Sequence, residues 1–171
     1  MRYLLSSLVQ IALLRKDPSV LPASIVLLAI LATAYGALNV LYAWISFGAD
    51  RVFARGVADL ALALLLFWSL LAVSGQRSRF RQTMSAVMGA SVLISPFVTG
   101  LLLLRWSAQA NEAIAVLMFM GSATLISWYI LIVGHILRSA IRVGFVTSLA
   151  LVVAWLFGSD VLLNRLFAMT A

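Results

Sequence analysis

The sequence has no cysteine and a single histidine, and only 10% of its 171 residues are charged. The absence of cysteine excludes disulfide bonds, thiolate nucleophiles, thiolate-held metals and palmitoylation. The shortage of charge excludes an ordinary soluble domain, in which about 25% of the residues are charged. Glycine-rich phosphate loops, Gly-x-Ser-x-Gly and His-Glu-x-x-His are also missing, so the sequence gives no basis for the common nucleotide-binding and hydrolase sites.

Apolar residues are what the sequence has in abundance, at 64% of the total, and they fall in five blocks separated by four short connections. A helix needs about 20 mainly apolar residues to cross a bilayer, and each block meets that length. The fold class predicted is therefore all-α, a single integral membrane domain that forms a bundle of five transmembrane helices. The predicted spans cover approximately residues 21–47, 56–74, 83–104, 113–137 and 143–163.

A shorter amphipathic segment, residues 2–16, precedes the first span. On a helical wheel, apolar side chains that include Leu8 and Ile11 fill one arc, and mainly small polar side chains fill the other. This pattern predicts a helix that lies on the cytoplasmic surface of the membrane. Pro18 is expected to end this helix, and Pro22 is expected in the first turn of the next one, where its missing N–H costs nothing.

The basic residues are distributed unevenly over the connections. Grouping alternate connections gives eight cations on one side and four on the other, with formal charges of +7 and 0 once the acids are counted. The positive-inside rule then predicts a cytoplasmic N-terminus and an outer C-terminus. Because these charges flank the spans, the partner they predict is anionic lipid headgroups rather than nucleic acid. The candidate headgroup-binding residues are Arg15, Lys16, Arg77, Arg79, Arg81, Arg138 and Arg142.

Polar and ionisable residues inside a span are candidates for function. Arg55 and Asp59 lie four residues apart on one helix face, which predicts an ion pair at the outer interface or a proton or cation relay. Asn39 predicts a hydrogen bond to a neighbouring helix or a contact with a substrate. Pro96 predicts a kink in the third span. His135 is expected to cap the end of the fourth span, with a ligand or pH-sensing role as the alternative.

These candidates do not combine into a catalytic or metal site. His135 belongs to the cytoplasmic side, whereas Asp50, Asp59, Glu112 and Asp160 belong to the outer side. A hydrocarbon layer of about 30 Å separates the two groups. We therefore predict that the protein is not an enzyme and uses no metal or cofactor.

Residues 5–38 carry a short helix that ends in a proline, a second proline soon after, and a first span rich in small residues. These features are Leu8 to Pro18, then Pro22, then Ala29 through Ala37. In this pattern, and in its five spans, the chain resembles the Yip family of membrane proteins, named for interaction with Ypt/Rab GTPases. Its short N-terminal segment is similar to that of the bacterial members, so Rab binding is not carried over. The resemblance implies a helical bundle in a bacterial inner membrane that acts through the membrane or through partners.

Two main functions remain open, and lipid handling at the cytoplasmic leaflet by the basic residues named above is a third. The first is a non-enzymatic adaptor, assembly factor or membrane-organising protein that contacts lipid and a membrane-protein partner or a second copy of itself. The second is a small transporter or channel subunit with a path near Asn39, Pro96 and Asp59, which requires polar groups to converge. If the polar residues of the spans converge around one water-accessible cavity, the transporter is favoured. If they are scattered among separate helix contacts, the adaptor is favoured. The polar residues that decide this are Asn39, Ser91, Ser95, Thr99, Ser122, Thr124 and Ser127.

Overall fold

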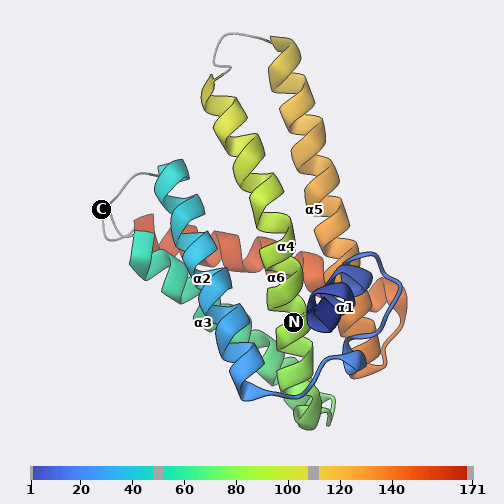
Figure 1. The fold of residues 1–171 in the computed structure, drawn as a ribbon. Coiled ribbons are helices and arrows are strands. Elements are labelled where there is room, and N and C mark those ends of the chain that lie inside the picture. Colours follow the sequence, from blue (N-terminus) through green and yellow to red (C-terminus); the bar gives the residue numbers. More distant parts are fainter. Residues whose placement is uncertain (1, 48–51, 108–111, 169–171) are drawn as a thin grey trace.

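The structure, a computed structural model, describes residues 2–47, 52–107 and 112–168 (Figure 1). Over these ranges the chain forms six α-helices and two short 3₁₀ helices, and it contains no strand. In chain order the elements are α1 (Arg2–Ala12), η1 (Pro18–Val20), α2 (Ile25–Phe47), α3 (Val52–Val73), η2 (Arg77–Arg79), α4 (Phe80–Ser107), α5 (Glu112–Ile141) and α6 (Phe145–Ala168).

The five long helices, α2 to α6, carry apolar segments of 21 to 30 residues that are able to cross a membrane. At about 1.5 Å per residue, each is longer than the hydrocarbon core is thick. Their outer surfaces are apolar and exposed, as shown by Trp68 at 50%, Phe119 at 75% and Val73 at 91%. Such surfaces suit lipid rather than water. The prediction of an all-α, multi-pass membrane protein is confirmed.

The helices are arranged as two hairpins and a crossing helix (Figure 1). Helices α2 and α3 form the first hairpin, and α4 and α5 form a longer one that extends beyond the rest of the molecule. Helix α6 leaves the end of α5 at a steep angle and passes behind α4 toward α3. The beginning of α3 and the end of α6 therefore lie close together, which positions the polar contacts described below.

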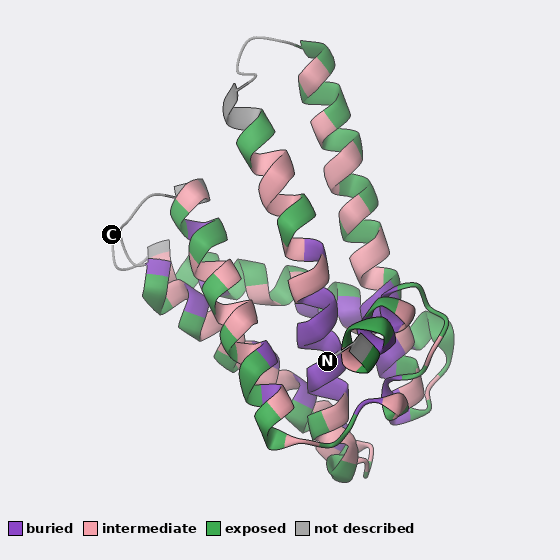
Figure 2. Cartoon of the chain, viewed as in Figure 1, coloured by how far each residue is buried: buried purple, intermediate pink, exposed green. Residues whose placement is uncertain are grey.

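The buried core lies at the end of the molecule where α1 packs against α4 and α5 (Figure 2). Most of its large side chains come from α3, α4 and α5, where the following are each less than 2% exposed: Phe67, Leu71, Met84, Met88, Ile132, Ile136 and Leu137. Small residues on α4 let the neighbouring helices approach, since Ala86 and Ala90 are 0% and 1% exposed. The other half of the α4–α5 hairpin has no comparable core.

Helix α1 is shorter than predicted and is packed against the bundle. It ends at Ala12 rather than near residue 16, and Leu14 follows with a φ of 60°. The helix ends with two hydrogen bonds characteristic of a helix C-terminus. The Leu14 N–H donates to the Ile11 carbonyl, and the Arg15 N–H donates to the Gln10 carbonyl. Leu8, Ile11 and Ala12 of its apolar arc are buried against the bundle, but Leu5 is exposed and Ser7 of the polar arc is buried. The indole of Trp128 donates to the Ala12 carbonyl at 3.1 Å.

The start of α2 also differs from the prediction. We expected Pro22 in its first turn, but Leu21 is extended with a ψ of 142° and the helix begins at Ile25. Ser24 is the reason, because its hydroxyl accepts a hydrogen bond from the Leu27 N–H at 3.3 Å. A serine in this position satisfies one of the free N–H groups of the first turn and fixes where a helix starts.

A close approach of α5 and α6 leads to a stability prediction. A Cβ added at Gly134 would stand 2.6 Å from Leu149 Cδ2 and 3.8 Å from Leu149 Cα, whereas one added at Gly158 would meet nothing within 4 Å. Gly134→Val should therefore lower stability by about 2 kcal/mol through overpacking. The matched change Gly158→Val should leave it nearly unchanged. Thermal unfolding of both variants in the same detergent measures this, and equal melting temperatures would contradict it.

Candidate functional site

A cavity of about 280 Å³ lies where α2 and the α4–α5 hairpin diverge. All five long helices contribute to its wall, and many of the contributing side chains are polar. The polar and aromatic members are Tyr35, Asn39, Tyr42, Asp59, Ser91, Ser95, Thr99, Tyr129, Trp155 and Ser159. Polar groups converging from separate spans are unusual in a bundle this apolar, and they mark this cavity as the candidate site.

Asp59 is the carboxylate of the cavity and is held by a neighbouring helix. The hydroxyl of Tyr35 on α2 donates to Asp59 Oδ2 at 2.6 Å. Both side chains are half-buried and both line the cavity. Asn39 follows Tyr35 by one helical turn and lines the same wall, so the three residues form a polar patch across α2 and α3.

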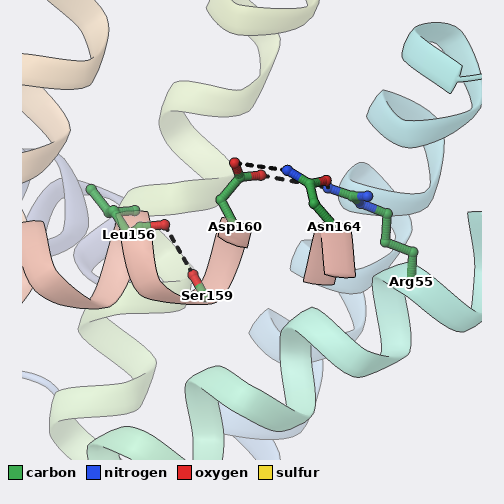
Figure 3. A network of polar contacts seen from close by, with 5 residues as sticks. All are labelled: Arg55, Leu156, Ser159, Asp160 and Asn164. Carbon is green, nitrogen blue, oxygen red and sulfur yellow. Dashed lines mark hydrogen bonds and ion pairs between the residues drawn. The ribbon is translucent and has the colours of Figure 1, made fainter. Parts of the chain in front are cut away.

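The guanidinium of Arg55 contacts α6 (Figure 3), and its charge still acts on Asp59 through space without the ion pair that the spacing predicted. Its guanidinium donates to Asn164 Oδ1 at 2.8 Å and lies 3.5 Å from Asp160 Oδ1. Asn164 in turn donates to Asp160 Oδ2 at 3.0 Å. This network joins the beginning of α3 to the end of α6. The spacing of four residues was therefore a poor guide to the partner of Arg55.

The opposite wall is built by α4 and α5 around a hydroxyl pair. Ser91 Oγ and the Tyr129 hydroxyl lie 3.0 Å apart, and Ser91 Oγ also donates to the Val87 carbonyl at 2.9 Å. Ser95 donates to the Ser91 carbonyl at 2.7 Å. Helix α4 continues through Pro96, which is itself exposed, while the residues on either side of it form the wall.

Trp155 lines the cavity, and its indole N–H is buried in the bundle. Its side chain is 7% exposed, and its indole Nε1 has no hydrogen-bond partner within the part of the chain that the structure describes. Phe67 holds the ring from below in an edge-to-face contact, with centroids 5.2 Å apart and planes at 82°. A buried N–H left without a partner costs about 1–3 kcal/mol, so it points to a missing acceptor.

Sequence reasoning identified part of this site. Of the seven polar residues taken as decisive, four line the cavity, namely Asn39, Ser91, Ser95 and Thr99. Ser122, Thr124 and Ser127 do not line it. Tyr35, Tyr129 and Trp155 were missed, because an aromatic residue inside an apolar span is usually counted as hydrophobic bulk. Their hydroxyl or indole N–H groups were the available signal, since such groups need partners in a membrane.

His135 does not cap a helix end, which corrects the expectation. Helix α5 continues to Ile141, so the imidazole is more than a turn from its end. Its Nε2 instead lies 3.3 Å from the Lys16 carbonyl oxygen and 3.8 Å from Asp17 Oδ1. His135 therefore contacts the segment that joins α1 to η1.

The seven candidate headgroup-binding residues do not surround one position. Arg77 lies over the ring of Trp68 at 5.6 Å, and Arg79 donates to the Ser139 carbonyl at 3.0 Å. Arg138 and Arg142 share a hollow of about 440 Å³, which Asp17 also lines. Arg15 and Arg81 are exposed and Lys16 is half-buried. Headgroup binding by this set stays a prediction.

The described ranges contain no group of three or more histidine and acidic side chains arranged to hold a metal ion. The cavity instead brings together one carboxylate, several hydroxyls and an amide, together with many apolar side chains. Comparison of the chain with protein-family models, curated proteins and solved structures finds no match, so the case for a function depends on this geometry.

Proposed function

We propose that this multi-pass membrane protein binds a small solute in the cavity between α2 and the α4–α5 hairpin, as a transporter or a transporter subunit. The convergence of polar side chains from five helices on one cavity carries this proposal. Four of the seven polar residues that distinguish the two hypotheses lie there, together with Asp59. A polar group inside a span is costly unless it meets another polar group or a solute.

The cavity is closed at one end, which favours a carrier over an open channel. Its wall on α4 spans Ser91 to Thr99, and deeper in the same helix Met84 and Met88 are buried. Ile132 and Ile136 fill the facing part of α5. The cavity is therefore closed toward the end of the molecule that carries the α3–α4 and α5–α6 turns. A site reached from one end at a time is what alternating access requires.

The charge distribution supports an orientation for this carrier. The α3–α4 and α5–α6 turns and the helix ends beside them hold five of the seven candidate headgroup-binding residues and lie at the same end of the bundle. We place this end in the cytoplasm and the cavity toward the outside. The protein then has an inner N-terminus and an outer C-terminus in a membrane with anionic lipid on its cytoplasmic face, for which a bacterial inner membrane is our proposal.

Water access to the cavity tests the proposal, and the lack of native cysteine makes the test clean. Thr99→Cys should react with a small, charged, membrane-impermeant methanethiosulfonate reagent added from outside, because Thr99 lines the cavity. Phe97→Cys is the matched control on the same helix. Its side chain is 61% exposed and does not line the cavity, so it should face lipid and react about tenfold more slowly.

The rates of labelling in native membranes decide between the two hypotheses. Fast labelling of Thr99→Cys with slow labelling of Phe97→Cys supports a water-filled binding cavity. Slow labelling of both would mean that lipid or a partner helix fills this space. That result would overturn the transporter proposal and return the adaptor hypothesis, with Yip-like partner contacts, to first place.

A further inference from the structure

We propose that the solute is a small organic cation, and that Asp59 is its counter-ion within an aromatic wall. This inference depends on the proposed binding function and specifies the chemical class of the solute. Two observations carry it: a carboxylate in the cavity that forms no ion pair in the described part of the chain, and aromatic side chains that line the same cavity.

The charge of Arg55 acts on the Asp59 carboxylate through space, but the two side chains form no ion pair in the described part of the chain. Among the residues that the structure describes, no lysine or arginine nitrogen lies within 4.0 Å of it. Arg55, the basic residue one turn before it, is engaged with Asp160 and Asn164 on α6. The hydrogen bond from Tyr35 is a neutral donor at 2.6 Å. A carboxylate inside a membrane-spanning helix is expensive without a charged partner, and a bound cation supplies one.

Aromatic side chains make up much of the surrounding wall. The rings that line the cavity are those of Tyr35, Tyr42, Tyr129 and Trp155. Ring faces attract cations, by about 2 kcal/mol or more when the site is desolvated, and quaternary ammonium groups are the ligands most often bound in this way. Tyr35 serves both purposes, since its hydroxyl orients the Asp59 carboxylate and its ring belongs to the wall.

The size of the cavity limits the solute. At about 280 Å³, the cavity lies just below the usual range for small-molecule sites, so an amino alcohol or a compound of similar size fits best.

Two probes test the cation assignment directly. One is choline, and the other is its neutral isostere, the alcohol in which a carbon atom replaces the quaternary nitrogen. Both are titrated into the full-length protein in lipid nanodiscs, and binding is followed by calorimetry. Choline should bind about tenfold or more tightly than the isostere, because only choline has the charge that Asp59 and the rings recognise. Equal binding of the two, or binding of the isostere alone, would overturn the cation assignment while leaving solute binding intact.

Two variants distinguish a counter-ion role of Asp59 from a general effect of removing a negative charge. Asp59→Asn should reduce the preference for choline over the isostere to about one, while binding of the isostere persists and shows that the cavity is still formed. Asp160→Asn is the matched control, since it makes the same change on α6 outside the cavity and should keep the full preference. An undiminished preference in Asp59→Asn would overturn the role of Asp59.

The two proposals fail in different ways. Absence of binding by both probes, with fast labelling of Thr99→Cys, would reject the cation and retain a water-filled cavity for another solute. Slow labelling of Thr99→Cys would reject the binding cavity itself, whatever the calorimetry shows.

Discussion

Phe67→Ala is expected to lower stability more than any other single truncation of an aromatic side chain in this protein. Phe67 is 1% exposed, contacts the α4–α5 core and holds Trp155 edge to face at 5.2 Å. In a soluble protein such a change costs about 3–5 kcal/mol. Here the transfer component is small, because the unfolded helices are solvated by lipid rather than water. The lost packing and ring contact remain, and we expect a loss of about 2 kcal/mol.

The control for this prediction is the same substitution on an exposed position. Phe97→Ala removes an equal volume from a side chain that is 61% exposed, so it should change stability by less than about 0.5 kcal/mol. Thermal unfolding of the wild type and both variants in one detergent gives the comparison. Indistinguishable melting temperatures for the two variants would show that the core around Phe67 is not tightly packed.

Phe67 also connects the core to the candidate site, which gives a second measurement. Trp155 lines the cavity on one side and rests on Phe67 on the other. Loss of that support should let the indole ring move and weaken binding of a solute in the cavity that the ring lines. A fall in solute affinity in Phe67→Ala, measured where the variant remains folded, would show that the packing below the cavity sets its geometry.

The number and type of the helices could be predicted from the sequence because the bilayer imposes a length on each one. Five apolar blocks of sufficient length gave five spans, and the structure has five such helices. The ends were less predictable. Pro22 was expected inside α2, but the hydroxyl of Ser24 starts the helix. Such ends depend on single hydrogen bonds, which hydropathy does not register.

The site could be predicted only in part, for a related reason. Asn39 and Asp59 stand out because polar groups in a span are rare. The side chains that surround them do not stand out in the sequence, because they come from segments far away along the chain. Tyr35 meets Asp59 across 24 residues, and Arg55 meets Asn164 across 109. The rule for residues four apart considers one helix at a time, so it paired Arg55 with Asp59 and missed α6.

Replacing basic residues in the α3–α4 and α5–α6 turns should have the largest effect on the protein in its membrane, because it removes the signal for orientation. Changing Arg77, Arg79, Arg81, Arg138 and Arg142 to Gln reduces the formal charge of that side from +7 to +2, against 0 on the other. The bias that sets topology then nearly disappears. We expect the C-terminus to be outside in nearly every wild-type molecule and in about half of the variant molecules.

A single cysteine appended to the C-terminus measures this orientation, because the chain has no other cysteine. The fraction labelled by a membrane-impermeant maleimide in intact cells reports how many molecules have that end outside. Arg165→Gln is the control, since it removes a cation from the opposite side and increases the difference between the two faces. Its labelling should equal that of the wild type. Complete labelling of the fivefold variant would mean that the N-terminal cations alone orient the protein. In that case the arginines of the two turns would be free for another role, and the hollow shared by Arg138 and Arg142 would be the place to look for bound anionic lipid.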